Sequence, residues 1–133
     1  MIGIVIVAHG GLAREYLSAV EHVVCKQTGI RAIAIEEDHD RAAKQSEIQA
    51  AADAVDTGEG VVVVTDMFGG SPSNLSLKAC VSRDRRIIYG ANLPMLIKLA
   101  KCRNLAVGEA VTLALEAGRK YINSYVGSGQ GSE

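Results

Sequence analysis

The sequence has no tryptophan, one phenylalanine, two prolines and only three cysteines. With so few aromatic residues, the core must be built from valine, isoleucine, leucine and alanine. Cys25, Cys80 and Cys102 are widely spaced, odd in number and form no CxxC pair, which argues against both a disulfide framework and a zinc site. Such cysteines are typical of a reducing compartment, so we expect a cytoplasmic protein.

Composition also disfavours membrane insertion and nucleic-acid binding. The longest apolar runs, residues 2–8 and 61–64, fall far short of the roughly 20 residues that cross a bilayer, and no charged segment of a signal peptide precedes the first run. The 14 basic and 15 acidic residues are interspersed, so the formal net charge of -1 gives no positive surface for nucleic acid or lipid headgroups. We therefore expect proteins or small molecules as partners.

The order of the segments predicts the fold. Short apolar runs typical of buried strands occupy residues 5–7, 31–35, 61–64 and 86–89. They alternate with segments of helical character: one from residue 12 to near Gly29, one capped by Asp38 or Asp40 and ending at Gly58, and others at 72–80, 95–102 and 109–120. We predict an α/β domain with a doubly wound, mainly parallel sheet of four strands in the flavodoxin-like order 2-1-3-4 and helices on both faces. Residues 121–126 form a candidate final strand of this 1–126 domain, and 127–133 a flexible tail.

Two polar residues directly follow buried strands. His9 ends the run "GIVIVAH", and Asp66 follows the third strand at the start of "DMFGGSPSN". In the predicted order these strands are neighbours, and open α/β sheets bind ligands at the carboxyl ends of such a pair. A carboxylate that holds one ring nitrogen of a histidine as a donor leaves the other nitrogen as a nucleophile. We therefore predict that His9 is a nucleophile oriented by Asp66.

The same loops are rich in groups that bind anions. Gly10, Gly11, Gly69 and Gly70 precede predicted helix starts, where backbone N–H groups attract negative charge. Ser71 is the expected N-cap of the helix that opens with a proline. Together these loops suit a phosphoryl group carried on His9, a reaction that requires no cofactor or metal ion.

These motifs carry a family resemblance. "VAHG" after the first strand, "DMFGGSPSN" after the third and "GANLPML" after the fourth occur in the order typical of one family, over about the first 126 residues. The chain resembles the enzyme IIA component of the mannose-type phosphoenolpyruvate-dependent sugar phosphotransferase system. The resemblance implies that His9 is phosphorylated through Nε2, while Asp66 holds Nδ1.

The resemblance also implies partners. The carrier protein HPr, itself charged through enzyme I, would donate the phosphoryl group, and an enzyme IIB component would accept it. Members of the family are homodimers in which a C-terminal strand crosses to pair antiparallel with the sheet of the other subunit, and residues 121–126 occupy that place here. Some members belong to systems that regulate metabolism and do not import sugar, so a regulatory role stays open.

Further site residues follow from matching motif positions. Ser71 and Asn92 match positions that line the site of the family, where each is a candidate hydrogen-bond donor to phosphate. Phe68 falls where the family often has an aromatic residue. With Met67 it is expected to form an apolar rim where HPr docks, since such side chains are favoured at interfaces.

Other interpretations stay open at this stage. A phosphotransferase subunit of a dihydroxyacetone kinase also carries a phosphohistidine after its first strand, and a noncovalent small-anion binding module would use the same loops. His22 lies on the first predicted helix and His39 in "EEDHD". A solvated acidic loop is favoured over a metal site there. No GxxxxGK[ST] motif is present, which argues against a mononucleotide-binding enzyme.

Overall fold

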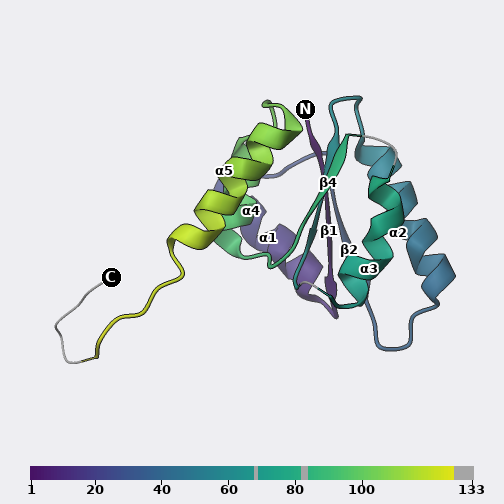
Figure 1. Cartoon of the computed structure of the whole chain (residues 1–133), viewed down its shortest axis with the longest axis horizontal. Helices are drawn as coiled ribbons and strands as arrows, with labels where there is room; N and C mark the ends of the chain where they lie inside the picture. Colours follow the sequence, from purple (N-terminus) through teal and green to yellow (C-terminus); the bar gives the residue numbers. More distant parts are fainter. Residues whose placement is uncertain (68, 82–83, 128–133) are drawn as a thin grey trace.

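A parallel sheet of four strands lies at the centre of the molecule (Figure 1). The strands are β1 (Gly3–His9), β2 (Ile30–Ile35), β3 (Val61–Thr65) and β4 (Arg85–Ile88). They follow the order β2-β1-β3-β4, and each neighbouring pair is parallel. The structure is a computed structural model that describes residues 1–67, 69–81 and 84–127. The predicted sheet with order 2-1-3-4 is confirmed.

Helices cover both faces of the sheet (Figure 1). One face carries α1 (Leu12–Val24), α4 (Leu93–Lys101) and α5 (Val107–Lys120), and the other carries α2 (Arg41–Val55), α3 (Ser71–Ser76) and the 3-10 helix η1 (Leu77–Cys80). Ile4 and Ile6 of β1 belong to the core under the first group, whereas Val5 and Val7 belong to the core under the second. Burial on both faces explains the continuous apolar sequences of β1 and β3. Among the described helices, none is both long and apolar enough to cross a membrane.

The starts of α2, α3 and α4 shape the loops at the carboxyl edge of the sheet. Of the two candidate caps for α2, Asp40 is the one used, and its side chain accepts the backbone N–H of Ala43. The prediction that Ser71 caps α3 is wrong, because the helix already begins at Ser71 and Gly70 takes the cap position. The hydroxyl of Ser73 ties the loop to this helix instead, accepting the N–H of Gly69 at 3.1 Å.

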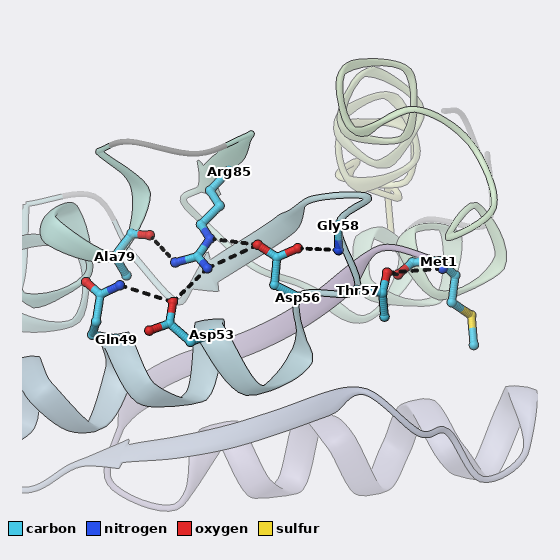
Figure 2. Close-up of polar contacts among 8 residues, drawn as sticks. All are labelled: Met1, Gln49, Asp53, Asp56, Thr57, Gly58, Ala79 and Arg85. Atoms are coloured by element: carbon cyan, nitrogen blue, oxygen red, sulfur yellow. Dashed lines mark hydrogen bonds and ion pairs between the residues drawn. The ribbon is translucent and has the colours of Figure 1, made fainter.

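A buried arginine anchors β4 at the opposite, amino-terminal edge of the sheet (Figure 2). The Arg85 side chain is 1% exposed and donates to Asp53, Asp56 and the carbonyl oxygen of Ala79 at 2.8 to 3.3 Å. Asp56 also accepts the N–H of Gly58 at 2.8 Å. The pKa of Asp56 is lowered by the Gly58 hydrogen bond and by Arg85, against the opposing effect of burial. This network ties the end of α2 to β4.

The segment after α5 forms no strand within the described chain. Residues 122–126 have no regular secondary structure, and the segment extends away from the body of the molecule (Figure 1). Its large side chains are 52 to 74% exposed: Tyr121, Ile122, Tyr125 and Val126. The strand expected at 121–126 finds no partner in this single chain, and its exchange with a second subunit stays a prediction. Residues 128–133 of the predicted tail lie outside the described residues.

Candidate active site

His9 and Asp66 meet at the carboxyl edge of the sheet. His9 is the last residue of β1 and Asp66 the first after β3, and these parallel neighbours are in register up to Val7 and Thr65. Nδ1 of His9 lies 2.8 Å from Oδ2 of Asp66, and the same oxygen accepts the backbone N–H of His9 at 3.0 Å. The structure thus brings together the two residues on which the sequence prediction depended.

This contact determines which ring nitrogen of His9 carries the hydrogen. Burial acts to raise the pKa of Asp66, but hydrogen bonds from the backbone and ring of His9 outweigh it and hold the pKa below its ordinary value. Asp66 is therefore a carboxylate at neutral pH. Because a carboxylate only accepts hydrogen bonds, Nδ1 of His9 carries the hydrogen. In the neutral ring, Nε2 then holds a free lone pair.

The two side chains differ in exposure. The His9 side chain is 50% exposed, whereas that of Asp66 is 11% exposed. The second carboxylate oxygen of Asp66, Oδ1, is buried and accepts no hydrogen bond from the described residues. Oδ2 therefore receives both the backbone and the ring hydrogen bond of His9.

Tyr16 of α1 is a neighbour of this pair that the sequence did not reveal. Its hydroxyl donates to the carbonyl oxygen of Ala91 at 3.0 Å, and the N–H of Ala91 donates to the carbonyl oxygen of Thr65, just before Asp66. Burial, and after it the charge of Asp66, raise the pKa of Tyr16. In the sequence Tyr16 is only one of several helical positions with apolar spacing. No local signal distinguishes it.

A shallow hollow opens beside His9. Its volume is about 460 Å³, and its lining comes from three parts of the chain: His9, Gly10, Ile35, Glu36, Glu37, His39 and Ser71. Two of the predicted phosphate-binding residues, Gly10 and Ser71, therefore lie at the same hollow as His9. The sequence does not predict that the loop after β2 lines this hollow, because its composition is typical of a solvated acidic loop.

Gly70 packs against the His9 ring. A Cβ atom built on Gly70 would lie 3.2 Å from Cε1 of His9. The backbone of Gly70 has φ −88° and ψ 178°, an extended conformation open to any residue. The missing side chain, and not an unusual backbone angle, is what lets the loop approach the ring.

Two of the predicted amide donors are engaged within the protein. The N–H of Gly10 donates to the carbonyl oxygen of Ile35 at 3.0 Å, and that of Gly69 donates to Ser73 at 3.1 Å. Both glycines have positive φ, 56° and 85°, so their local role is to turn the backbone. The candidates for an amide cradle are then Gly11, Gly70 and Ser71, at the starts of α1 and α3.

The remaining predicted residues are placed as follows. Asn92 caps α4, with Oδ1 accepting the N–H of Met95 at 3.0 Å while Nδ2 donates to the carbonyl oxygen of Gly118 at 2.8 Å. Nδ2 has two hydrogens, and this bond uses one of them. Met67 is 52% exposed beside Asp66, and Phe68 lies outside the described residues.

Within the described parts of the chain, no group of three or more histidine, cysteine or acidic side chains is arranged to hold a metal ion.

Known proteins share this sequence pattern. The profile of the EIIA-man family, described as "PTS system fructose IIA component", matches residues 3–115. The chain is 29% identical over 126 residues to the PTS system mannose-specific EIIAB component of Escherichia coli, covering 92% of this chain and 39% of that protein. It therefore spans about two fifths of the length of the curated relatives that it matches.

Solved structures share the fold. The phosphotransferase system component EIIA from Streptococcus agalactiae matches with a TM-score of 0.82 at 25% identity, over 93% of this chain and 97% of that one. The PTS IIA protein associated with the fucose utilization operon from Streptococcus pneumoniae matches with a TM-score of 0.79 at 25% identity, over 91% of each chain. Since the family profile also spans most of the sequence, the chain belongs to the EIIA-man family of phosphotransferase system IIA components.

Proposed function

We propose that this protein is a phosphocarrier of the phosphoenolpyruvate-dependent sugar phosphotransferase system, which accepts a phosphoryl group from HPr on His9 and passes it to an enzyme IIB component in the cytoplasm. The observation that carries the proposal is the 2.8 Å contact between Nδ1 of His9 and Oδ2 of Asp66 at an exposed edge of the sheet. Membership of the EIIA-man family supports it, as do relatives named for mannose-specific EIIAB and EIIA components.

The transfer begins at Nε2 of His9. Its lone pair attacks the phosphorus atom of the donor's phosphoryl group, and a phosphorus–nitrogen bond forms. The bond between phosphorus and the donor atom breaks, and its electron pair returns to the donor. Nε2 loses no proton, because the hydrogen of the neutral ring is on Nδ1. Delivery is the reverse: a lone pair of the acceptor attacks phosphorus, and the electrons of the phosphorus–nitrogen bond return to Nε2.

Asp66 stabilises the phosphorylated ring. Once Nε2 is bonded to phosphorus while Nδ1 keeps its hydrogen, the imidazole carries a positive charge. The Asp66 carboxylate, whose pKa lies below its ordinary value, stays ionised and offsets that charge at 2.8 Å. A carboxylate beside a catalytic histidine stabilises the imidazolium of serine hydrolases in the same manner.

The backbone beside the ring provides the site for the phosphoryl oxygens. Gly70 lies next to Cε1 of His9, the ring atom that joins Nδ1 and Nε2, so the start of α3 lies beside the ring nitrogen that would carry the phosphoryl group. Backbone N–H groups of Gly11, Gly70 and Ser71 are the donors that we assign to the phosphoryl oxygens, with Gly10 and Gly69 shaping the loops. Asn92 holds the start of α4 through Oδ1, and since Nδ2 has a second N–H beside the one donated to Gly118, Asn92 stays a candidate donor to phosphate.

Partner proteins dock around the exposed face of His9. Met67 is 52% exposed directly after Asp66, and we assign it, together with Phe68, to the apolar rim that contacts HPr. Methionine adapts well to more than one partner surface. One rim can therefore serve the donor and the enzyme IIB acceptor in turn.

The exposed segment after α5 is proposed to form the dimer contact. Residues 121–126 place four large hydrophobic side chains in solvent, each more than half exposed. Pairing of this segment with the sheet of a second subunit would satisfy its backbone N–H and C=O groups and bury these side chains.

Phosphorylation of the purified protein tests the proposed function. Incubation with phosphoenolpyruvate, enzyme I and HPr is expected to add one phosphate-sized, acid-labile mass increment. The increment is expected to be absent from His9→Ala and retained in His22→Ala, a control on the exposed end of α1. Saturable binding of inorganic phosphate without a covalent adduct on the wild type would instead identify an anion-binding module and overturn the proposal.

A further inference from the structure

His39 lies in the loop between β2 and α2 and lines the same hollow as His9. This loop, residues 36–40, has the sequence "EEDHD". Its four acidic residues are exposed, whereas His39 is half-buried. His39 is therefore the least exposed residue of this acidic loop, and it lines the hollow together with Glu36 and Glu37.

One hydrogen bond fixes the His39 ring. Its Nδ1 lies 2.8 Å from the carbonyl oxygen of Glu36. Because a carbonyl oxygen only accepts hydrogen bonds, Nδ1 carries a hydrogen. Nε2, on the opposite side of the ring, is then the nitrogen that becomes a second donor when the imidazole is protonated.

The charges around the hollow favour a positively charged donor. The titratable residues in the lining are His9 from the end of β1 and Glu36, Glu37 and His39 from the loop, and neither lysine nor arginine is among the lining residues. A phosphoryl group on His9 would bring further negative charge toward two glutamates. Apart from His9 itself, His39 is the lining residue that can carry a compensating positive charge.

We propose that His39 is a binding residue for the phosphoryl group carried on His9, to which its imidazolium donates the Nε2 hydrogen. The proposal rests on the proposed function of His9. No bond to His39 is formed, and the residue acts by stabilising the phosphorylated state against the repulsion from Glu36 and Glu37. The protein is therefore more readily phosphorylated at pH values where His39 is protonated.

Two substitutions separate this role from a structural one. His39→Asn keeps a side-chain N–H near the position of Nδ1, so it can still donate to Glu36, but it has no group at the position of Nε2. His39→Gln has an N–H near the position of Nε2 but no charge. His22→Asn, on the exposed end of α1, is the matched control.

The experiment measures the equilibrium of phosphoryl exchange between HPr and the full chain from pH 5.5 to 8.5. At pH 6 we expect the equilibrium constant for phosphorylation of His39→Asn to be about two- to fivefold lower than that of wild type. This change corresponds to the free energy of a partly exposed ion pair. The deficit should vanish by pH 8.5. His39→Gln should show a smaller deficit at pH 6, which also disappears by pH 8.5, and His22→Asn none.

Two outcomes would overturn the inference while leaving the proposed function intact. One is a His39→Asn profile that coincides with wild type or is lowered equally at every pH, which would indicate a structural role. The other is a nitrogen NMR spectrum of the neutral free protein in which His39 carries its hydrogen on Nε2. Failure of the wild type to be phosphorylated by HPr at any pH would overturn the proposed function itself.

Discussion

Gly70 and His9 are in such close contact that a Cβ atom on Gly70 would lie 3.2 Å from Cε1 of the ring. Contacts this short require the neighbour to move by a few tenths of an ångström. The neighbour here is the residue proposed to receive the phosphoryl group. Because Gly70 of the "FGG" motif has no Cβ atom, the imidazole of His9 can lie directly against the backbone of that motif.

Gly70→Ala is expected to slow phosphorylation of His9 by roughly 3- to 10-fold, because a displaced ring loses part of its alignment for attack. The fold should persist, since the extended backbone at Gly70 accepts alanine. Gly108→Ala within α5 is the control: the nearest atoms to its Cβ would belong to the Arg86 side chain, at 3.4 to 3.9 Å, an ordinary contact distance. Initial rates with phosphorylated HPr measure both variants. Equal rates for Gly70→Ala and Gly108→Ala would contradict the assigned contact.

Asp66→Asn is expected to slow phosphorylation by about 100-fold with little change in thermal stability. The amide oxygen can still accept from the backbone and ring of His9, but it no longer offsets the positive charge of the phosphorylated ring. Since the pKa of Asp66 is below its ordinary value, the wild-type rate should show no loss from protonation of this group above about pH 5, one unit above that ordinary value. Rapid-quench kinetics provide the rates, and thermal unfolding provides the stability control. An unchanged rate would remove Asp66 from the mechanism.

Asp56→Asn is expected to lower the free energy of unfolding at pH 7 by about 1.5 to 3 kcal/mol, because hydrogen bonds to the buried Arg85 lose their charged acceptor. Asp56 has a lowered pKa in the folded state. The charge of Asp56 therefore contributes to folding stability at pH values above about 3.9, the pKa of an aspartate in the unfolded chain. This contribution is lost as the pH falls through the lower pKa of the folded state. Urea unfolding at pH 7 and below pH 4 measures the difference, with the exposed Asp38→Asn as control.

The same Asp56→Asn variant should be phosphorylated at the wild-type rate at pH 7, since Arg85 begins β4 whereas His9 ends the parallel strand β1, so the two lie at opposite edges of the sheet. A stability difference that persists undiminished at low pH would contradict the role assigned to the Asp56 charge.

Removal of residues 121–133 is expected to convert a dimer into a folded monomer. The described part of the segment, residues 121–127, carries exposed hydrophobic side chains and contributes no residue to the two core clusters. A chain that ends at residue 126 is the control and should remain dimeric, because it keeps the proposed exchanged strand. Sedimentation equilibrium measures the mass of each. A dimer that survives loss of residues 121–133 would place the subunit contact elsewhere.

Local sequence determined the fold to a large extent. Buried strands of a parallel sheet are apolar without interruption, as in β1 and β3, and this pattern can be read without knowing what covers them. The prediction failed at the cap of α3, where both Gly70 and Ser71 are acceptable cap residues before Pro72. A choice between two adequate local signals depends on how the loop packs against its neighbours, here the hydroxyl of Ser73 and the ring of His9.

The sequence by itself determined that His9 and Asp66 would occupy the same edge, because each directly follows a strand and the strands of a parallel sheet end together. Tertiary structure alone decided which residues surround them. Tyr16 reaches Ala91 across 75 positions of the chain, and His39 enters the hollow from a loop that looks merely acidic in the sequence. Such contacts depend on how a helix or loop is oriented on the sheet, and no local pattern encodes that orientation.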